Sequence, residues 1–301
     1  MLEFHAFGND LCVRRQKCLN VIKYIYDTLV QTLSSNATAQ CSFTLWSIAG
    51  PPAVLGPSHF YQSSISASSW FSHCQFTGGT MLASYGSLAF TNCLWERVAT
   101  YLADGPNPSP WYLYNNLFFG GTLTLGLNTN PPGPLYAFDN LFDRTAIVNN
   151  SGVSSNGYNA YVTNCTTLAN SQGNDVILTN SPVYQTSYLG TYYYPTNGGL
   201  LSTLINAGSR SATNAALYHF TTTTNQVKEA ATTVDIGFHY VAIDPSTGQP
   251  YDADGDGIPD YLEDANGDGA YGAGDLSDWR TYNSRNGLSG ASGLEVFTPL
   301  R

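Results

Sequence analysis

A short segment recurs along the middle of this chain about every two dozen residues. Each copy places a cysteine or an asparagine in a short segment of apolar, aromatic and polar residues. The copies cover residues 71–76, 90–95, 113–118, 137–142 and 161–166, with a weaker one at 177–180. The shared central position is held by Cys74, Cys93, Asn116, Asn140 and Cys165. A unit of this length cannot bury its own apolar face, so successive units are expected to stack on one another.

Each unit contains two or three short alternating strands separated by glycine turns, as at Gly78-Gly79 and Gly120-Gly121. No unit has a helical pattern long enough for a βαβ crossover. The sequence therefore predicts a parallel β-helix, whose coils stack at about 4.8 Å and pair their backbones. Asparagine amides can hydrogen-bond along such a stack, and cysteine fills the same position as a small buried group. A β-sandwich with coincidental internal similarity is the alternative.

The composition agrees with an all-β chain. Of the 301 residues, 43% are hydrophobic and only 11% are charged, which argues against a disordered chain and against a free-standing helical bundle. The net charge is −10, and the acidic residues gather between Asp252 and Asp278. Because no basic surface is evident, nucleic acid is not an expected partner. No apolar run approaches the ~20 residues of a transmembrane helix, so no membrane span is expected.

Apolar residues near the N-terminus follow helical spacing at Leu19, Ile22, Tyr26, Leu29, Val30 and Leu33. This pattern predicts a helix over about 18–33 that covers the open end of the coil, where free strand edges otherwise invite aggregation. Lys23 and Asp27 interrupt the apolar stretch, so it does not match a signal peptide. Residues 1–40 are therefore interpreted either as a helical cap or as a non-native start.

Two later segments carry a family resemblance. Residues 204–209 read LINAGS and residues 234–240 read VDIGFHY, and this pair is similar to the closing signature of many secreted bacterial β-helix proteins. Together with the repeat, the pair resembles the pectin-lyase-like superfamily of right-handed parallel β-helix proteins. The resemblance implies a β-helix over 41–243 and a secreted or cell-surface location. It leaves the function open, because the family includes polysaccharide lyases, glycoside hydrolases and adhesins.

An acidic segment, residues 252–263, reads DADGDGIPDYLE. It matches a calcium-binding loop at ligand positions 1, 3, 5, 7, 9 and 12, which are Asp252, Asp254, Asp256, Ile258, Asp260 and Glu263. Ile258 offers its backbone carbonyl, and Gly257 permits the sharp turn at position 6. Two carboxylates about 4 Å apart repel by about 4 kcal/mol at an effective dielectric of about 20. Convergent carboxylates at this spacing therefore predict a bound calcium ion.

A second and weaker loop follows without a gap over residues 264–275. Its positions 1, 3, 5 and 12 are Asp264, Asn266, Asp268 and Asp275, while position 9 is a glycine. Because no helix separates the two loops, they resemble thrombospondin type 3 calcium repeats, which implies calcium as the bound ion. A solvated acidic linker is the alternative. We assign the tandem loops to 244–281, and 282–301 to a tail or a junction with a further domain.

Catalytic motifs are not evident in the sequence, which contains no GxSxG, HExxH or P-loop pattern. The best candidates are Glu96 and Asp143, which occupy equivalent positions two units apart and are each followed by arginine. Such a carboxylate pair is typical of glycosidases; ion pairs within turns are the alternative. The sequence thus favours a secreted calcium-binding β-helix that serves as a structural or glycan-contacting surface module without catalysis. A polysaccharide lyase or glycoside hydrolase with a divergent site is the second hypothesis.

Overall fold

The computed structural model describes residues 10–12, 20–24, 30–32, 38–48, 58–62, 68–83, 86–102, 109–125, 134–148 and 153–282. The chain forms two compact units. Unit 1 comprises Met1–Val183, Thr203–Ser209 and Ile236–Phe238. Unit 2 comprises Tyr184–Ser202, Arg210–Asp235 and His239–Arg301.

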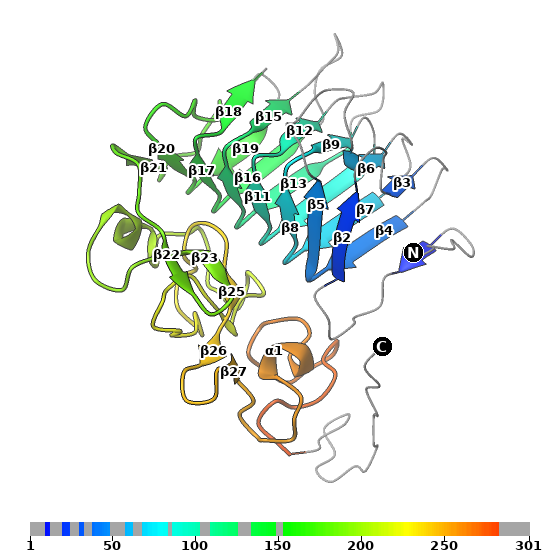
Figure 1. The fold of residues 1–301 in the computed structure, drawn as a ribbon, viewed down its shortest axis with the longest axis vertical. Coiled ribbons are helices and arrows are strands. Elements are labelled where there is room, and N and C mark those ends of the chain that lie inside the picture. Colours follow the sequence, from blue (N-terminus) through cyan, green and yellow to red (C-terminus); the bar gives the residue numbers. More distant parts are fainter. Residues whose placement is uncertain are drawn as a thin grey trace. The chain divides into compact units, whose positions relative to one another are not determined.

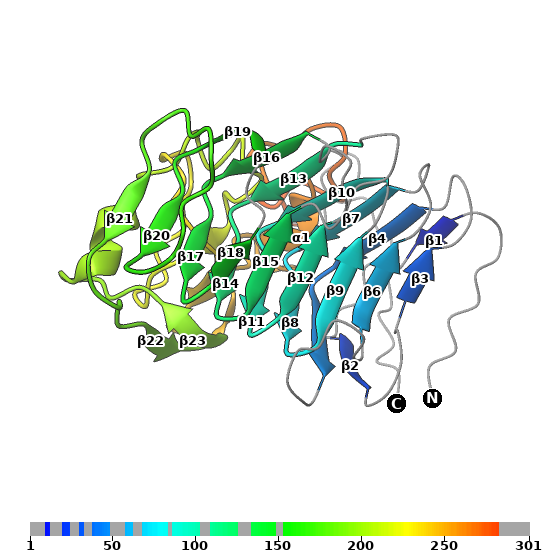
Figure 2. The same ribbon diagram turned by 90° about the horizontal axis from the view of Figure 1, so that it is seen from above.

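Unit 1 is a parallel β-solenoid built from three sheets, and from β1 to β20 the chain visits the sheets in the same order on each turn (Figures 1 and 2). Sheet A contains β1 (Asp10–Cys12), β4 (Thr38–Ser42), β7 (Ser68–Ser72), β10 (Ser87–Thr91), β13 (Trp111–Tyr114), β16 (Leu135–Phe138) and β19 (Val153–Gly157). Sheet B contains β2 (Asn20–Tyr24), β5 (Thr44–Ile48), β8 (Gln75–Thr77), β11 (Leu94–Glu96), β14 (Leu117–Phe119), β17 (Leu141–Asp143), β20 (Ala160–Val162) and β21 (Val176–Leu178). Sheet C contains β3 (Val30–Thr32), β6 (Ser58–Gln62), β9 (Thr80–Ala83), β12 (Ala99–Leu102), β15 (Thr122–Leu125) and β18 (Ala146–Val148).

This architecture confirms the predicted all-β parallel solenoid, but the helix predicted over 18–33 is wrong in the part that the structure describes. Residues 20–24 form β2, which pairs in parallel with β5, and residues 30–32 form β3, which pairs in parallel with β6. Of the six apolar residues that suggest a helix, Ile22 and Val30 lie in these two strands, and the other four lie outside the described residues. The parallel strands thus run from β1 to β21, compared with the predicted range of 41–243.

A continuous file of aromatic rings fills the interior along sheet B. Its six members, none more than 2% exposed, are Trp46, Phe76, Trp95, Phe118, Phe142 and Tyr161. Each ring stacks on the next with centroids 4.4–5.8 Å apart. Parallel in-register pairing places equivalent residues of successive strands one above the other, so an aromatic residue repeated at one position becomes a stack.

The amide ladder predicted from the repeat is present, with one correction. Asn116 Nδ2 donates to Asn140 Oδ1 at 2.9 Å, and Asn140 Nδ2 donates to Asn159 Oδ1 at 3.0 Å. Cys93 precedes Asn116 on the same file, as the register of β11 and β14 requires. Cys165 does not belong to the file, because the pairing of Leu141 with Ala160 puts Asn159 at the equivalent position.

The turn between sheets A and B has the same backbone conformation on successive rungs. The residue before each ladder position has φ between 50° and 63° in Phe43, His73, Asn92, Asn115, Asp139 and Tyr158. Left-handed φ in non-glycine residues is uncommon and costs energy. Here the amides of Phe43, His73, Asn92, Asn115 and Tyr158 donate to the next rung, for example from Asn92 N to Tyr114 O at 2.8 Å. The stack itself therefore holds the conformation in place.

The two segments that carry the family resemblance meet in unit 1. Ile236 N donates to Leu204 O at 3.0 Å. The buried carboxylate of Asp139 accepts hydrogen bonds from the amide and the hydroxyl of Ser209 at 2.6 and 2.8 Å. These contacts tie the later segments to a turn of the solenoid.

Unit 2 contains little regular structure. Its strands form three antiparallel pairs: β22 (Gln185–Ser187) with β23 (Gly190–Tyr193), β24 (Phe220–Thr221) with β25 (Tyr240–Val241), and β26 (Ile243–Asp244) with β27 (Gln249–Pro250). A 3-10 helix covers Leu200–Leu204, where the chain passes from unit 2 to unit 1, and the α-helix α1 of unit 2 covers Asp260–Glu263. Among the described residues, no helix has the length and apolar character needed to cross a membrane.

Candidate metal centre

The two acidic loops of unit 2 fold in the same way. At position 4 the φ angle is 76° in Gly255 and 70° in Gly267, and at position 6 it is 90° in Gly257 and 80° in Gly269. These left-handed angles suit glycine and turn the chain sharply back on itself. The sequence match between the loops is therefore also a match in backbone conformation.

The same three side-chain hydrogen bonds recur in both loops. The residue at position 1 accepts from the amide at position 6, position 3 accepts from position 5, and position 5 accepts from position 7. In the first loop these bonds are Asp252 Oδ2 to Gly257 N at 2.9 Å, Asp254 Oδ1 to Asp256 N at 3.1 Å, and Asp256 Oδ1 to Ile258 N at 2.8 Å. In the second loop they are Asp264 Oδ2 to Gly269 N at 2.7 Å, Asn266 Oδ1 to Asp268 N at 2.9 Å, and Asp268 Oδ1 to Ala270 N at 2.7 Å.

Carboxylates converge in the first loop. Asp252, Asp254 and Asp256 each direct one oxygen to a common region, where these oxygens lie within 4.8 Å of one another. The completely buried Glu263 lies close enough for the charges of Asp254 and Asp256 to act on it. Of the six positions predicted as ligands, three carboxylates therefore converge, and the fourth, Glu263, feels the charge of two of them.

Glu263 is the most perturbed acid of the site. Its Oε1 accepts a hydrogen bond from Ser277 Oγ at 2.6 Å, while its buried Oε2 has no hydrogen-bond partner among the described residues. Burial, followed by the negative charges of Asp254, Asp256 and Asp260, raises the pKa of Glu263 to about 8 against the opposing effect of Ser277. A buried carboxylate oxygen beside other carboxylates is the environment that a cation stabilises.

Asp260, the predicted ligand at position 9, makes different contacts. Its Oδ1 accepts from Ala253 N at 2.6 Å, and its Oδ2 lies 3.2 Å from Lys228 Nζ. The Lys228 ammonium also lies over the ring of Tyr251, 4.8 Å from the centroid. Asp260 thus anchors the first loop within unit 2, and its contacts differ from those expected of a direct ligand.

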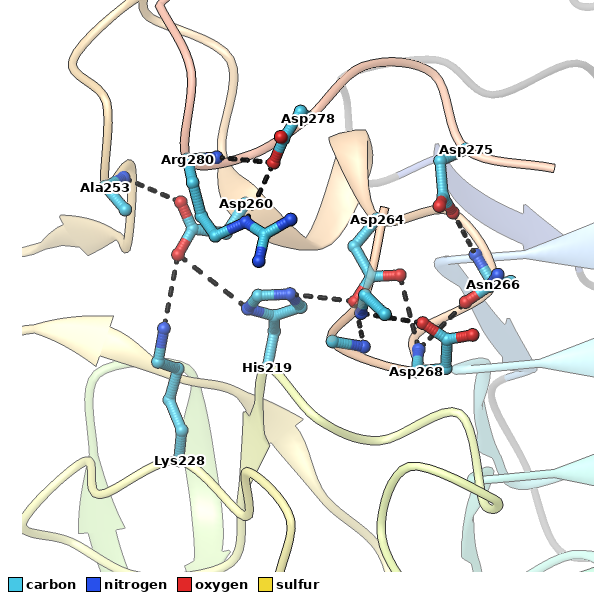
Figure 3. Close-up of polar contacts among 12 residues, drawn as sticks. His219, Lys228, Ala253, Asp260, Asp264, Asn266, Asp268, Asp275, Asp278 and Arg280 are labelled. Atoms are coloured by element: carbon cyan, nitrogen blue, oxygen red, sulfur yellow. Dashed lines mark hydrogen bonds and ion pairs between the residues drawn. The ribbon is translucent and has the colours of Figure 1, made fainter. Parts of the chain in front are cut away.

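A buried histidine connects the two loops. His219 Nε2 lies 2.9 Å from Asp264 Oδ2, and His219 Nδ1 lies 3.7 Å from Asp260 Oδ2. Figure 3 shows the imidazole between these two carboxylates, with Lys228 also reaching Asp260. No sequence motif points to His219.

The second loop is closed by Asp275, whose oxygens accept from Asn266 N and Gly272 N at 3.3 and 2.7 Å.

The donor set of the first loop fits calcium. Hard cations of this kind take oxygen ligands, and calcium accepts several carboxylates in a flexible arrangement. Asp254 Oδ2 and Glu263 Oε2 are both buried and lack hydrogen-bond partners among the described residues. Burial and the neighbouring Asp256 and Asp252 also raise the pKa of Asp254. A cation between these oxygens removes both the repulsion and the cost of burying unpaired charge.

Glu96 and Asp143, the catalytic candidates, occupy the same position of sheet B on β11 and β17, with Phe119 of β14 between them. Arg144 Nε lies 3.6 Å from an oxygen of Asp143, and the Asp143 side chain is completely buried. Arg97 lies 3.4 Å from Glu96, which is 30% exposed. Because a completely buried carboxylate cannot contact a polysaccharide, this geometry favours ion pairs within turns.

A scan against protein-family models, a search of curated proteins and a search of solved structures each gave no match for this chain. Any function must therefore be argued from the geometry of the sites.

Proposed function

We propose that this chain is a secreted or cell-surface calcium-binding β-solenoid of the pectin-lyase-like type, and that it serves as a structural module with a glycan-contacting face. The main support is the conformation shared by the two acidic loops, which have the same glycine angles and the same three side-chain hydrogen bonds. A solvated acidic linker has no reason to repeat this geometry.

In this proposal the first loop provides the stronger calcium site. Asp252, Asp254, Asp256 and Glu263 supply carboxylate oxygens, and Ile258 supplies its backbone carbonyl. Asp260 is not a direct ligand in this proposal; it anchors the loop, because its oxygens already contact Ala253 N and Lys228 Nζ. In the second loop the ligands are Asp264, Asn266, Asp268 and Asp275. Bound calcium fixes a part of unit 2 that has little regular structure.

Isothermal titration of the chelator-treated protein with calcium tests this proposal. We expect saturable binding, and we expect Asp256→Ala to weaken the affinity of the first site by about tenfold or more, because one of the convergent carboxylates is removed. Asp244→Ala is the matched control, since Asp244 lies outside the ligand positions 252–275 and caps a turn at Ser246. The absence of heat in the unmodified protein, or equal affinities of the two variants, would contradict the calcium proposal.

The outer face of sheet A supports the glycan part of the proposal. Tyr112 stacks on Tyr136 with centroids 5.3 Å apart, and Tyr114 stacks on Phe138 at 6.2 Å. Trp70 of the same sheet is 44% exposed. The strands from β4 to β19 of this sheet carry no charged residue. Flat amphipathic rings on an uncharged surface suit the apolar faces of sugar rings, and favour a neutral polysaccharide over an acidic polymer.

Binding to a panel of neutral and acidic polysaccharides, with and without calcium, tests this face. Tyr112→Ala is expected to lower the affinity for a neutral polysaccharide by up to roughly tenfold, since a stacked ring contributes about 0.5–1.5 kcal/mol. Tyr101→Ala, on β12 of sheet C, is the matched control. Retention of full affinity by Tyr112→Ala contradicts the assignment of the face. If the protein depolymerises a polysaccharide and Glu96→Ala abolishes that activity, the lyase or hydrolase alternative is supported instead.

A further inference from the structure

A second group of possible metal ligands lies in unit 2, apart from the acidic loops. Glu229, Asp235 and His239 are all buried, with exposed fractions of 6%, 3% and 1%. One ligand atom from each lies within 4.8 Å of the other two. We propose that these three side chains bind one transition-metal ion of the zinc class.

The spacing of the donor atoms supports this site. Glu229 Oε1 and His239 Nε2 are 3.3 Å apart, longer than the 2.7–2.9 Å of a charge-assisted hydrogen bond. Ligand atoms in a tetrahedral site with bonds of about 2.0–2.2 Å lie about 3.3–3.6 Å apart. The separation is therefore the one that two ligands of a common ion adopt.

Neighbouring hydroxyls orient both carboxylates. Thr222 Oγ1 donates to Asp235 Oδ2, and Thr232 Oγ1 lies 3.4 Å from Glu229 Oε2. In metal sites such outer contacts fix the direction of a ligand and raise its affinity for the ion. Two carboxylates in a buried position are also costly as ions, and a divalent cation between them offsets both charges.

The chemistry of the donors distinguishes this site from the acidic loops. Calcium is bound by oxygen ligands alone, whereas an imidazole with carboxylates suits zinc and its neighbours among the transition metals. None of the three residues lies in the segment 252–275. The zinc site and the calcium site can therefore be tested separately in one protein, and either proposal can fail without the other.

The test uses the full chain, stripped of metal by a chelator and then held in excess calcium so that the acidic loops are saturated. Titration with zinc is expected to reveal one ion per chain, and His239→Gln is expected to lower its affinity by about tenfold or more. His73→Gln, which removes an imidazole from the solenoid, is the matched control and is expected to leave the affinity unchanged.

A second measurement needs no variant and so does not depend on the folding of His239→Gln. Cobalt added to the unmodified protein in excess calcium is expected to give the intense visible absorption of a tetrahedral site, which stoichiometric zinc then removes. The proposal is overturned if the unmodified protein binds no zinc under these conditions, or if folded His239→Gln binds zinc as tightly as the His73→Gln control.

Discussion

Phe118→Ala is expected to lower the free energy of unfolding of the solenoid unit by about 3–5 kcal/mol. Phe118 lies within the interior file of rings, 5.4 Å from Trp95 and 5.1 Å from Phe142, and only 2% of it is exposed. Its strand β14 is paired on both sides, to β11 and to β17. Because these backbones are fixed by their ladders, the neighbouring rings cannot collapse into the space, and the cavity cost adds to the lost burial.

Denaturation by guanidinium, followed by tryptophan fluorescence, measures this loss, since Trp46, Trp95 and Trp111 are buried in unit 1. The matched control is Phe119→Ala. Phe119 is the next residue of the same strand, but it faces outward beneath the guanidinium of Arg144, whose Cζ lies 5.1 Å from the ring. It is expected to contribute only about 1 kcal/mol. Equal losses for the two variants would show that the interior file has no special role.

The solenoid could be predicted because its repeat leaves a direct trace in the sequence. Cys74, Cys93, Asn116 and Asn140 align by eye, and the strand register places them on one file. The prediction failed at Cys165 because the rungs become shorter: the next ladder position is Asn159, only 19 residues after Asn140. The spacings of 19, 23 and 24 residues between the earlier ladder positions gave no warning of this change.

The prediction of an N-terminal helix was wrong for a different reason. Apolar residues at helical spacing between 18 and 33 also fit two short strands, and local pattern alone cannot separate these readings when strands have three to five residues. Parallel pairing of β2 with β5 and of β3 with β6 decides between them. This information is non-local, because it depends on the rung that follows.

In the candidate metal centre, too, some residues could be predicted from the sequence and others could not. The positions of the acidic ligands follow from spacing within one loop, so the sequence predicts them. His219 and Lys228 contact Asp260 and Asp264 from 32 to 45 residues away, a distance over which spacing carries no signal. The group of Glu229, Asp235 and His239 is likewise assembled by the fold of unit 2.

In the presence of a chelator, the stability of unit 2 is expected to fall by roughly 2–4 kcal/mol as the pH rises from about 5 to about 8. The ordinary pKa of a glutamate is 4.5, whereas burial and the nearby aspartates raise that of Glu263 to about 8. Between these values the folded protein holds a proton that the unfolded chain has lost. Stability is therefore highest below about pH 4.5 for this group and declines through pH 8.

Saturating calcium is expected to remove the part of this dependence that comes from Glu263, because the ion replaces the proton and binds the deprotonated carboxylate. Calorimetric melts at several pH values, with chelator and with calcium, measure both slopes. Glu263→Gln should reduce the decline seen in chelator, leaving the part due to Glu229, whose pKa burial raises to about 7, and should also weaken calcium binding. Glu96→Gln, a partly exposed carboxylate of the solenoid, should change neither. A decline of unchanged size in Glu263→Gln would assign the titration to other groups, such as Glu229. If calcium left the slope unchanged in the unmodified protein, Glu263 would not be a ligand, because one carboxylate cannot hold the proton and the ion at the same time.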